Sequence, residues 1–182
     1  MRILSMIAGV FMLTATAATA QTYKDPENTL LLQLKDGTVV IQLMPEVAPN
    51  HVARIKELAR KGFYDGVVFH RVIEGFMAQT GDPTGTGTGG SDLPDLKAEF
   101  NSKKHITGTL SAARASDPDS ANSQFFICFK PAPFLDGQYT VYGQVIEGME
   151  FVNNITRGEP PANPDKIISL KVAADVAKPA AQ

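Results

Sequence analysis

Cysteine, basic charge and long apolar runs are all scarce in this chain of 182 residues, and each shortage excludes a class of protein. Cys128 is the only cysteine, so the chain can form no internal disulfide and no cysteine-rich zinc site. Lys and Arg number 17 against 19 Asp and Glu, a formal net charge of −2. Without a basic surplus to neutralise phosphates, neither nucleic acid nor an anionic membrane surface is an expected partner.

The sequence also lacks the usual marks of a metal site or a nucleophilic enzyme. No pair among His51, His70 and His105 stands at metal-ligand spacing, and the G-x-S-x-G motif is absent. Residues 85–90 fit G-x-G-x-x-G, but prolines flank them and no helix pattern follows, so we interpret them as a loop with unusual backbone angles. We therefore expect no metal, nucleotide or organic cofactor.

The only long apolar run lies at the N-terminus. Arg2 precedes an apolar stretch over residues 3–13, and Ala18 and Ala20 follow it, which is the pattern of a signal peptide cleaved after Ala20. The run is short for a bilayer span and no later run is longer, so we expect no membrane insertion once residues 1–20 are removed. A buried first helix is the alternative.

The remaining chain is long enough for one domain with a real core. Apolar segments predict strands, and those at 30–35 and 38–43 are joined by Asp36-Gly37, a two-residue hairpin signal. Apolar residues at helical spacing predict a helix over 50–61, and a second helix is expected over 148–155. The other predicted strands are 67–72, 76–79, 110–115, 124–129, 140–145 and 167–172.

Eight short strands and two helices predict a mainly β protein, a closed eight-stranded antiparallel β-barrel capped by two α-helices. Residues 81–107 are expected to form a long Gly/Thr/Pro-rich loop, and long loops in compact domains are often functional. We expect a flexible segment at 21–28, one barrel domain at 29–173 and a disordered tail at 174–182. A monomer is expected.

The segment 69–82 carries an unusual combination of residues. It places Arg71 among large apolar side chains and an uncharged amide, without a nucleophile. Such a set suits a reaction in which no covalent bond breaks and one bond only rotates. Strand alternation would put Phe69, Arg71 and Ile73 on one face, opposite His70. An arginine stacked on aromatic rings at a solvated surface is the alternative interpretation of Arg71.

Several other residues have plain structural interpretations. His70 could act as a general base, but without a nucleophile we interpret it as a hydrogen-bonded structural histidine. Cys128 lies in the apolar run 125–129 and is expected to behave as a small buried hydrophobe. Large apolar residues elsewhere could belong to the core, as most do.

Besides the glycine loop at 85–90, the chain contains five distinctive stretches, at 69–82, 110–113, 123–128, 134–137 and 141–145. Together they resemble the cyclophilin family of peptidyl-prolyl cis-trans isomerases. The resemblance covers roughly residues 29–172, and the order and spacing of the stretches make it specific. The family implies an eight-stranded antiparallel barrel with a helix at each end.

The resemblance implies a non-covalent mechanism. Rotation about a peptide bond costs ~18–20 kcal/mol because of its double-bond character, and uncatalysed X-Pro exchange is slow. An enzyme needs only to favour the twisted bond over the planar one. As the bond twists, the prolyl nitrogen gains a lone pair, which the Arg71 guanidinium would stabilise. The implied substrates are proline-containing peptides and unfolded or partly folded exported proteins.

The resemblance also implies the site residues. Arg71, Gln79 and Phe76 are the expected catalytic residues, and Gln79 would hydrogen-bond the substrate backbone. An apolar pocket for the proline ring would combine Phe76 with Met77, Phe126 and Leu135. The expected substrate-binding residues are Met77, Ala113, Arg114, Ala115, Gln124, Phe126, Phe134, Leu135 and Tyr139.

Three positions depart from the pattern of many relatives. Arg114 stands in place of asparagine, Phe134 in place of tryptophan and Tyr139 in place of histidine. The last two changes resemble bacterial members, and with the signal peptide they predict a location in the periplasm of a Gram-negative cell. Release outside the cell and a eukaryotic secretory lumen are the alternatives. Because no indole N–H is present, we expect weak cyclosporin binding.

Two other functions stay open on sequence grounds. A peptide-binding or chaperone module could use the same groove without turnover. A small-ligand carrier would need an open barrel lumen, whereas the many Leu, Val, Ile and Phe of the strands favour a filled one.

Overall fold

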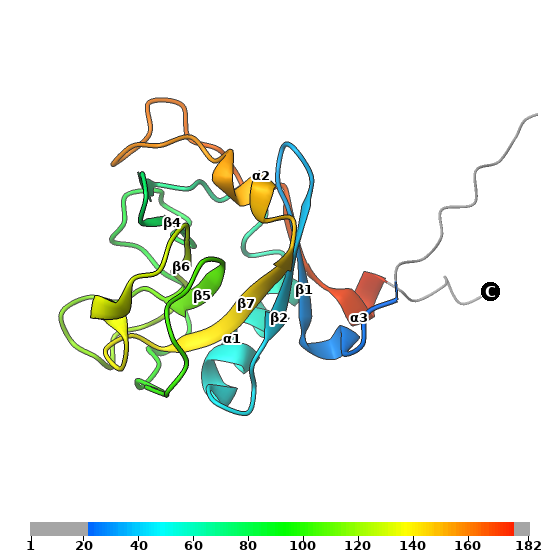
Figure 1. Ribbon diagram of the computed structural model, residues 1–182, viewed down its shortest axis with the longest axis vertical. Helices are drawn as coiled ribbons and strands as arrows, with labels where there is room; N and C mark the ends of the chain where they lie inside the picture. Colours follow the sequence, from blue (N-terminus) through cyan, green and yellow to red (C-terminus); the bar gives the residue numbers. More distant parts are fainter. Residues whose placement is uncertain (1–21, 177–182) are drawn as a thin grey trace, which may run out of the picture.

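The computed structural model describes residues 22–176 and shows a single curled sheet (Figure 1). The predicted signal peptide, 1–20, and residues 177–182 of the predicted tail lie outside the described residues. The eight antiparallel strands follow the order β3-β4-β6-β5-β7-β2-β1-β8. Their bounds are β1 Thr29–Gln33, β2 Thr38–Leu43, β3 Arg71–Ile73, β4 Met77–Thr80, β5 Thr109–Ala112, β6 Phe125–Cys128, β7 Val141–Glu147 and β8 Ser169–Val172.

The sheet is an open half-barrel, so the prediction of a closed barrel is wrong. Strands β3 and β8 form its two ends and are not hydrogen-bonded to each other. The segments that precede them meet at an isolated bridge of Val68 with Lys166, where three backbone hydrogen bonds join residues 66–69 to residues 165–167. The loop that precedes β8 contains Pro160, Pro161 and Pro164, which have no backbone N–H to donate to a strand ladder.

Helices α1 (Pro49–Arg60) and α2 (Met149–Asn153) lie where the sequence predicts helices, at opposite ends of the strands in Figure 1. The buried face of α1 includes Val52, Ile55 and Leu58, as its periodicity predicts. Its first turn is capped from afar by Glu99, whose carboxylate accepts the backbone N–H groups of Asn50 and His51 at 3.1 and 3.0 Å.

Two segments that were expected to be flexible or disordered contain short helices. The 3₁₀ helix η1 (Pro26–Asn28) lies within the predicted flexible segment, and α3 (Ala173–Val176) includes the start of the predicted tail. Both are tied to α1 through Arg60, which pairs with Glu27 at 2.8 Å and with Asp175 at 2.9 Å. These long-range ion pairs leave no local signal in the sequence.

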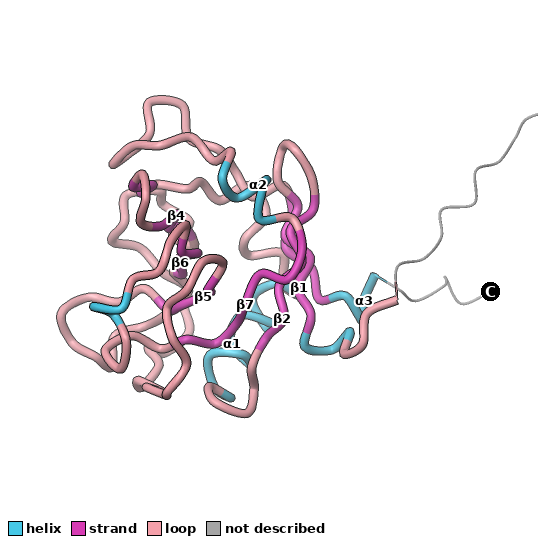
Figure 2. The backbone as a smooth tube through the Cα atoms, viewed as in Figure 1, coloured by secondary structure: helices cyan, strands magenta, loops and turns pink. Residues whose placement is uncertain are grey.

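Loops occupy much of the molecule around β4, β5 and β6 (Figure 2). The chain between β4 and β5 contains no helix or strand among its described residues, apart from an isolated bridge at Leu96, so the predicted long loop is confirmed. A second 3₁₀ helix, η2 (Pro133–Leu135), lies between β6 and β7.

Strand β6 divides the core into two parts by simple alternation. Phe125 and Ile127 belong to the main core, which contains buried residues of the sheet and of α1. Phe126 and Cys128 point to the other side, into a smaller apolar cluster with Met77 and Leu135. Cys128 is fully buried, as predicted, and burial, together with the nearby Asp136 carboxylate, raises the pKa of its thiol to about 12. The smaller cluster is the floor of the site described next.

Candidate active site

Three neighbouring strands bring the central residues of the site into one row. In the sheet register Arg71 of β3 lies opposite Gln79 of β4, and Gln79 lies opposite Phe126 of β6. Directly opposite residues in antiparallel strands have their side chains on the same face, with Cβ atoms about 4.5–5.5 Å apart. An arginine, an amide and an aromatic ring that are far apart in the sequence therefore meet on one surface.

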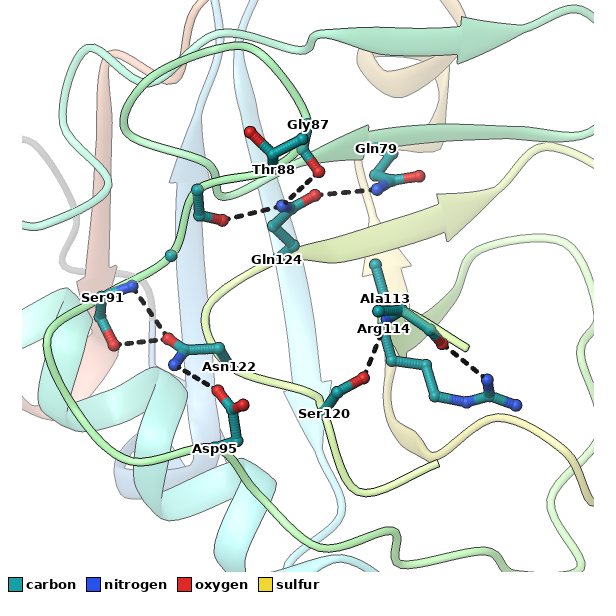
Figure 3. A pocket seen from close by; sticks show the side chains of 13 residues that line it. Gln79, Gly87, Thr88, Ser91, Asp95, Ala113, Arg114, Ser120, Asn122 and Gln124 are labelled. Atoms are coloured by element: carbon teal, nitrogen blue, oxygen red, sulfur yellow. Dashed lines mark hydrogen bonds between the residues drawn. The ribbon is translucent and has the colours of Figure 1, made fainter. Parts of the chain in front are cut away.

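Hydrogen bonds fix the amide in the middle of this row. Gln79 Nε2 donates to Gln124 Oε1 at 2.9 Å, and Gln124 Nε2 donates to the carbonyl oxygens of Gly87 and Gly89 at 3.1 and 2.9 Å (Figure 3). The other end of Gln79, Oε1, lies 3.5 Å from Arg71 Nη1. Because Gln124 is anchored to the glycine loop, the carbonyl oxygen of Gln79 is turned toward the arginine.

An apolar hollow of about 380 Å³ lies beside the row. Its floor is the smaller apolar cluster, and Phe134, on its rim, is 64% exposed with its ring 5.4 Å from that of Phe76. The site therefore offers an aromatic surface to a ligand. The residues that line this hollow are Arg71, Phe76, Met77, Gln79, Ala113, Arg114, Phe126, Phe134, Leu135 and Tyr139.

A second hollow, of about 480 Å³ and more polar, shares a wall with the first. Gln79, Ala113 and Arg114 line both hollows, and Ala115 and Gln124 line only the second. All the site residues that the resemblance implied thus lie on one continuous surface. Sequence reasoning missed the other side chains of the second hollow, which are Thr88, Ser91, Asp95, Ser120 and Asn122.

Asn122 holds the far wall of the polar hollow (Figure 3). Its Oδ1 accepts the backbone N–H and the hydroxyl of Ser91 at 2.9 and 2.7 Å. Its Nδ2 donates to the carbonyl oxygen of Leu93 and to Asp95, both at 2.9 Å. The only sequence signal for this residue was its position immediately before the recognised stretch 123–128.

Arg114 stands on the wall between the two hollows. Its guanidinium carbon lies 4.5 Å from the centre of the Tyr139 ring. Its Nη1 and Nη2 donate to the carbonyl oxygens of Ala115 and Gln138, each at 2.9 Å. No carboxylate among the described residues pairs with it, so it adds positive charge to the groove.

The glycine loop is built around one buried carboxylate. Asp82 accepts the backbone N–H groups of Thr84, Thr86, Gly87 and Gly89, at distances between 2.6 and 3.1 Å. Burial alone would raise the pKa of Asp82, but the hydrogen bonds from the Thr84 hydroxyl and from these backbone N–H groups outweigh it and hold the pKa well below its ordinary value. The loop is therefore structural, as predicted, and its Gly87 has a φ of +88° that favours glycine.

Two predictions about the start of the 69–82 segment are wrong. Phe69 does not share a face with Arg71, because β3 begins only at Arg71 and Phe69 is fully buried in the main core. His70 is buried beneath Gly87, and neither of its ring nitrogens has a hydrogen-bond partner among the described residues. Burial lowers the pKa of His70, and it lines neither hollow, so nothing supports a role as general base.

Within residues 22–176 no group of three or more His, Cys, Asp and Glu side chains could hold a metal ion. The arrangement offers instead a cation, an oriented amide and an apolar hollow. Such a site can grip an apolar ring and stabilise charge that develops on a nearby atom.

Comparison with known proteins assigns the family. A family model described as "Cyclophilin type peptidyl-prolyl cis-trans isomerase/CLD" matches residues 29–172. A probable peptidyl-prolyl cis-trans isomerase of Brucella suis is 51% identical over 178 residues, covering 89% of this chain and 88% of the relative. Peptidyl-prolyl cis-trans isomerase B of Bacillus subtilis is 47% identical over 128 residues, covering 69% of this chain and 89% of the relative.

Solved structures agree with the sequence relatives. A cyclophilin from Hirschia baltica superposes with a TM-score of 0.78 at 32% identity, covering 84% of this chain and 76% of that one. A cyclophilin-type isomerase from Cryptosporidium parvum, in the presence of the dipeptide Ala-Pro, has a TM-score of 0.75 at 30% identity, covering 79% and 98%. The half-barrel is thus the cyclophilin fold. The chain belongs to the cyclophilin family of peptidyl-prolyl cis-trans isomerases, enzymes that rotate X-Pro peptide bonds.

Proposed function

We propose that the apolar hollow binds the proline ring of a substrate and that Arg71 favours the twisted X-Pro bond. The observation that carries the proposal is the row of Arg71, Gln79 and Phe126 along the rim and floor of that hollow. The related structure in the presence of Ala-Pro supports proline-containing peptides as the ligand.

The chemistry follows from charge and orientation. In the planar bond the prolyl nitrogen shares its lone pair with the carbonyl group, and twisting returns the lone pair to the nitrogen. A guanidinium N–H directed at this nitrogen stabilises the twisted state more than the planar one, so it lowers the barrier. Gln79 binds the substrate backbone and fixes its orientation relative to Arg71, since its own amide is held by Gln124.

The proposed biological role is assistance to the folding of exported proteins in the periplasm, by a monomeric enzyme. The N-terminal pattern ending at Ala20 supports export. Among residues 22–176 no helix is long and apolar enough to cross a membrane. Fractionation of cells of the source organism tests the location, because recovery of the protein in the cytosol with its first twenty residues intact would contradict it.

The experiment that tests the molecular proposal is exchange of a short X-Pro peptide followed by NMR. Wild type should accelerate exchange, whereas Arg71→Ala should reduce it to near background while still binding the peptide. Absence of acceleration by folded wild type would instead favour a binding or chaperone module. For the same protein we expect weak cyclosporin inhibition, because Phe134 offers no N–H, and tight nanomolar inhibition would contradict this.

A further inference from the structure

The loop between α2 and β8 supplies Arg71 with a partner that lies outside both hollows. Gly158 in this loop pairs with Val72 of β3 through two backbone hydrogen bonds, one in each direction, both 2.8 Å long. In an antiparallel pair this register places the next loop residue, Glu159, directly opposite Arg71. The position of Glu159 is therefore set by the backbone and not by a chance meeting of two long side chains.

Glu159 contacts the Nε edge of the Arg71 guanidinium. Arg71 Nε donates to Glu159 Oε1 at 2.8 Å, and Arg71 Nη1 lies 3.5 Å from Gln79 Oε1. Arg71 lines the apolar hollow, whereas Glu159 lines neither hollow. Arg71 Nη2 makes no hydrogen bond to any described residue, so it is free for a ligand.

The loop that carries Glu159 is itself anchored. Thr156 donates its backbone N–H and its hydroxyl to Asp165 at 2.7 and 2.9 Å, which closes the base of the loop. Arg157 pairs with Glu74 at 2.6 Å. Gly158 has a φ of +147°, and a Cβ there would lie only 2.5 Å from Pro161 Cα, so a larger residue would disturb the loop.

We propose that Glu159 is a positioning residue for Arg71. Its carboxylate holds Nε, so that the Nη edge of the guanidinium stays turned toward the X-Pro bond. An unrestrained arginine samples many rotamers, and holding it increases the fraction of time in the productive geometry. The inference rests on the proposed role of Arg71.

The size of the effect follows from exposure. The side chains of Arg71 and Glu159 are 42% and 52% exposed, and ion pairs at such sites contribute little to stability. We therefore expect Glu159→Ala to leave the melting temperature nearly unchanged. Its kcat should fall by roughly three- to fivefold with KM unchanged, since the substrate touches Arg71 and not Glu159.

The test compares Glu159→Ala and Glu159→Gln with a matched control, Glu74→Gln, in X-Pro exchange followed by NMR. Glu159→Gln keeps an oxygen that can accept from Arg71 Nε, so it should recover about half of the lost rate. Glu74→Gln removes a carboxylate that contacts the same loop without touching Arg71, and should match wild type. The Nε–Hε signal of Arg71 should exchange faster with solvent in Glu159→Ala than in wild type.

Two results would overturn the inference. A Glu159→Ala rate equal to wild type means that the carboxylate does not position Arg71. A Glu159→Gln rate above wild type means that the carboxylate instead weakens the charge of Arg71.

Adding Glu159→Ala to Arg71→Ala should have no further effect, because the positioned group is already absent. If Arg71→Ala itself retains full exchange, the proposed function fails. If Arg71→Ala abolishes exchange and Glu159→Ala equals wild type, only the positioning role fails.

Discussion

The two hollows of the site are built by different means. The apolar hollow is based on strands, and the backbone register of β3, β4 and β6 aligns Arg71, Gln79 and Phe126 in one row. The polar hollow is walled mainly by loops, which two side chains, Asp82 and Asn122, hold in place through hydrogen bonds. The contrast indicates that chemistry is placed on the rigid sheet, while contacts with the rest of a substrate are placed on loops that can vary.

Among the substitutions that distinguish the two hollows, Phe126→Ala should have the largest effect, and that effect should concern the apolar hollow. Phe126 is nearly buried on β6 and stacks beside His105, so truncation opens a cavity of a kind that costs about 3–5 kcal/mol in protein cores. We expect kcat/KM to fall about a hundredfold in peptide exchange. Phe126→Leu should retain most of the stability, which separates loss of the proline contact from loss of folding. Equal activity of Phe126→Ala and wild type would contradict the assignment of this hollow.

Asp82→Ala should have the next largest effect, and it should disturb the loop of the polar hollow before it disturbs the strands of the apolar one. It leaves several N–H groups of the glycine loop without acceptors, each at a cost of about 1–3 kcal/mol if they stay buried. We expect a loss of roughly 3 kcal/mol in the free energy of unfolding, measured with denaturant. Asp82→Asn should be less destabilising. Amide exchange at Gly87 and Gly89 should accelerate before that of β4 and β6.

Acidic pH should destabilise the same loop. The pKa of Asp82 is lower in the folded state than in the unfolded chain, so protonation favours unfolding. Its stabilisation is complete above the unfolded pKa of about 4 and is lost as pH falls below that value. Unfolding measured between pH 7 and pH 2 should show this loss, and Asp82→Asn should show a smaller one. A wild-type stability that is flat across this range would contradict the argument.

Asn122→Ala should affect long substrates more than short ones. Asn122 ties Ser91, Leu93 and Asp95 into the wall of the polar hollow but does not reach the apolar one. For a peptide that extends beyond the residue before proline, we expect KM to rise by about fivefold, on the scale of one lost hydrogen bond. A minimal X-Pro substrate should be exchanged as by wild type. Equal losses on both would mean that the two hollows are not separable.

Arg114→Ala should have the smallest effect. The guanidinium stands on the shared wall and stacks on Tyr139, an interaction worth about 0.5–1 kcal/mol at exposed sites. We expect KM to rise about two- to threefold, which corresponds to the loss of an interaction of about that energy, with kcat unchanged. Arg114→Lys should restore charge without the fork geometry, and comparison of the two variants separates charge from packing.

Sequence reasoning was most successful where one strand or helix decides the outcome. The hairpin of β1 and β2, helix α1 and the buried Cys128 followed from local pattern. The predicted position of the hairpin turn was one residue too late, because Leu34 pairs with Gly37 and leaves Lys35 and Asp36 as the two turn residues. Closure of the barrel did not follow from local pattern, because it depends on whether the two end strands, which are far apart in the sequence, pair with each other. Alternation also misplaced Phe69, since it assumes a strand that begins earlier than β3 does.

The residues of the site were accessible to sequence reasoning only through resemblance. Physical pattern alone singled out Arg71, but composition and spacing could not place Gln79 and Phe126 beside it, because that depends on long-range register. Asn122 and Glu159 were missed for the same reason. Each acts through a contact with a distant segment, Ser91 in one case and Arg71 in the other.

The central claim is that Arg71 acts on the twisted bond and not on binding of the planar one. The most direct measurement is NMR exchange of a saturating X-Pro peptide with Arg71→Ala, together with the Kd of the same peptide. Exchange of the bound peptide should fall at least about a hundredfold, the scale of one lost electrostatic donor, while Kd should change by less than about threefold. A Kd that rises in proportion to the loss of rate would contradict it, because Arg71 would then contribute equally to both states.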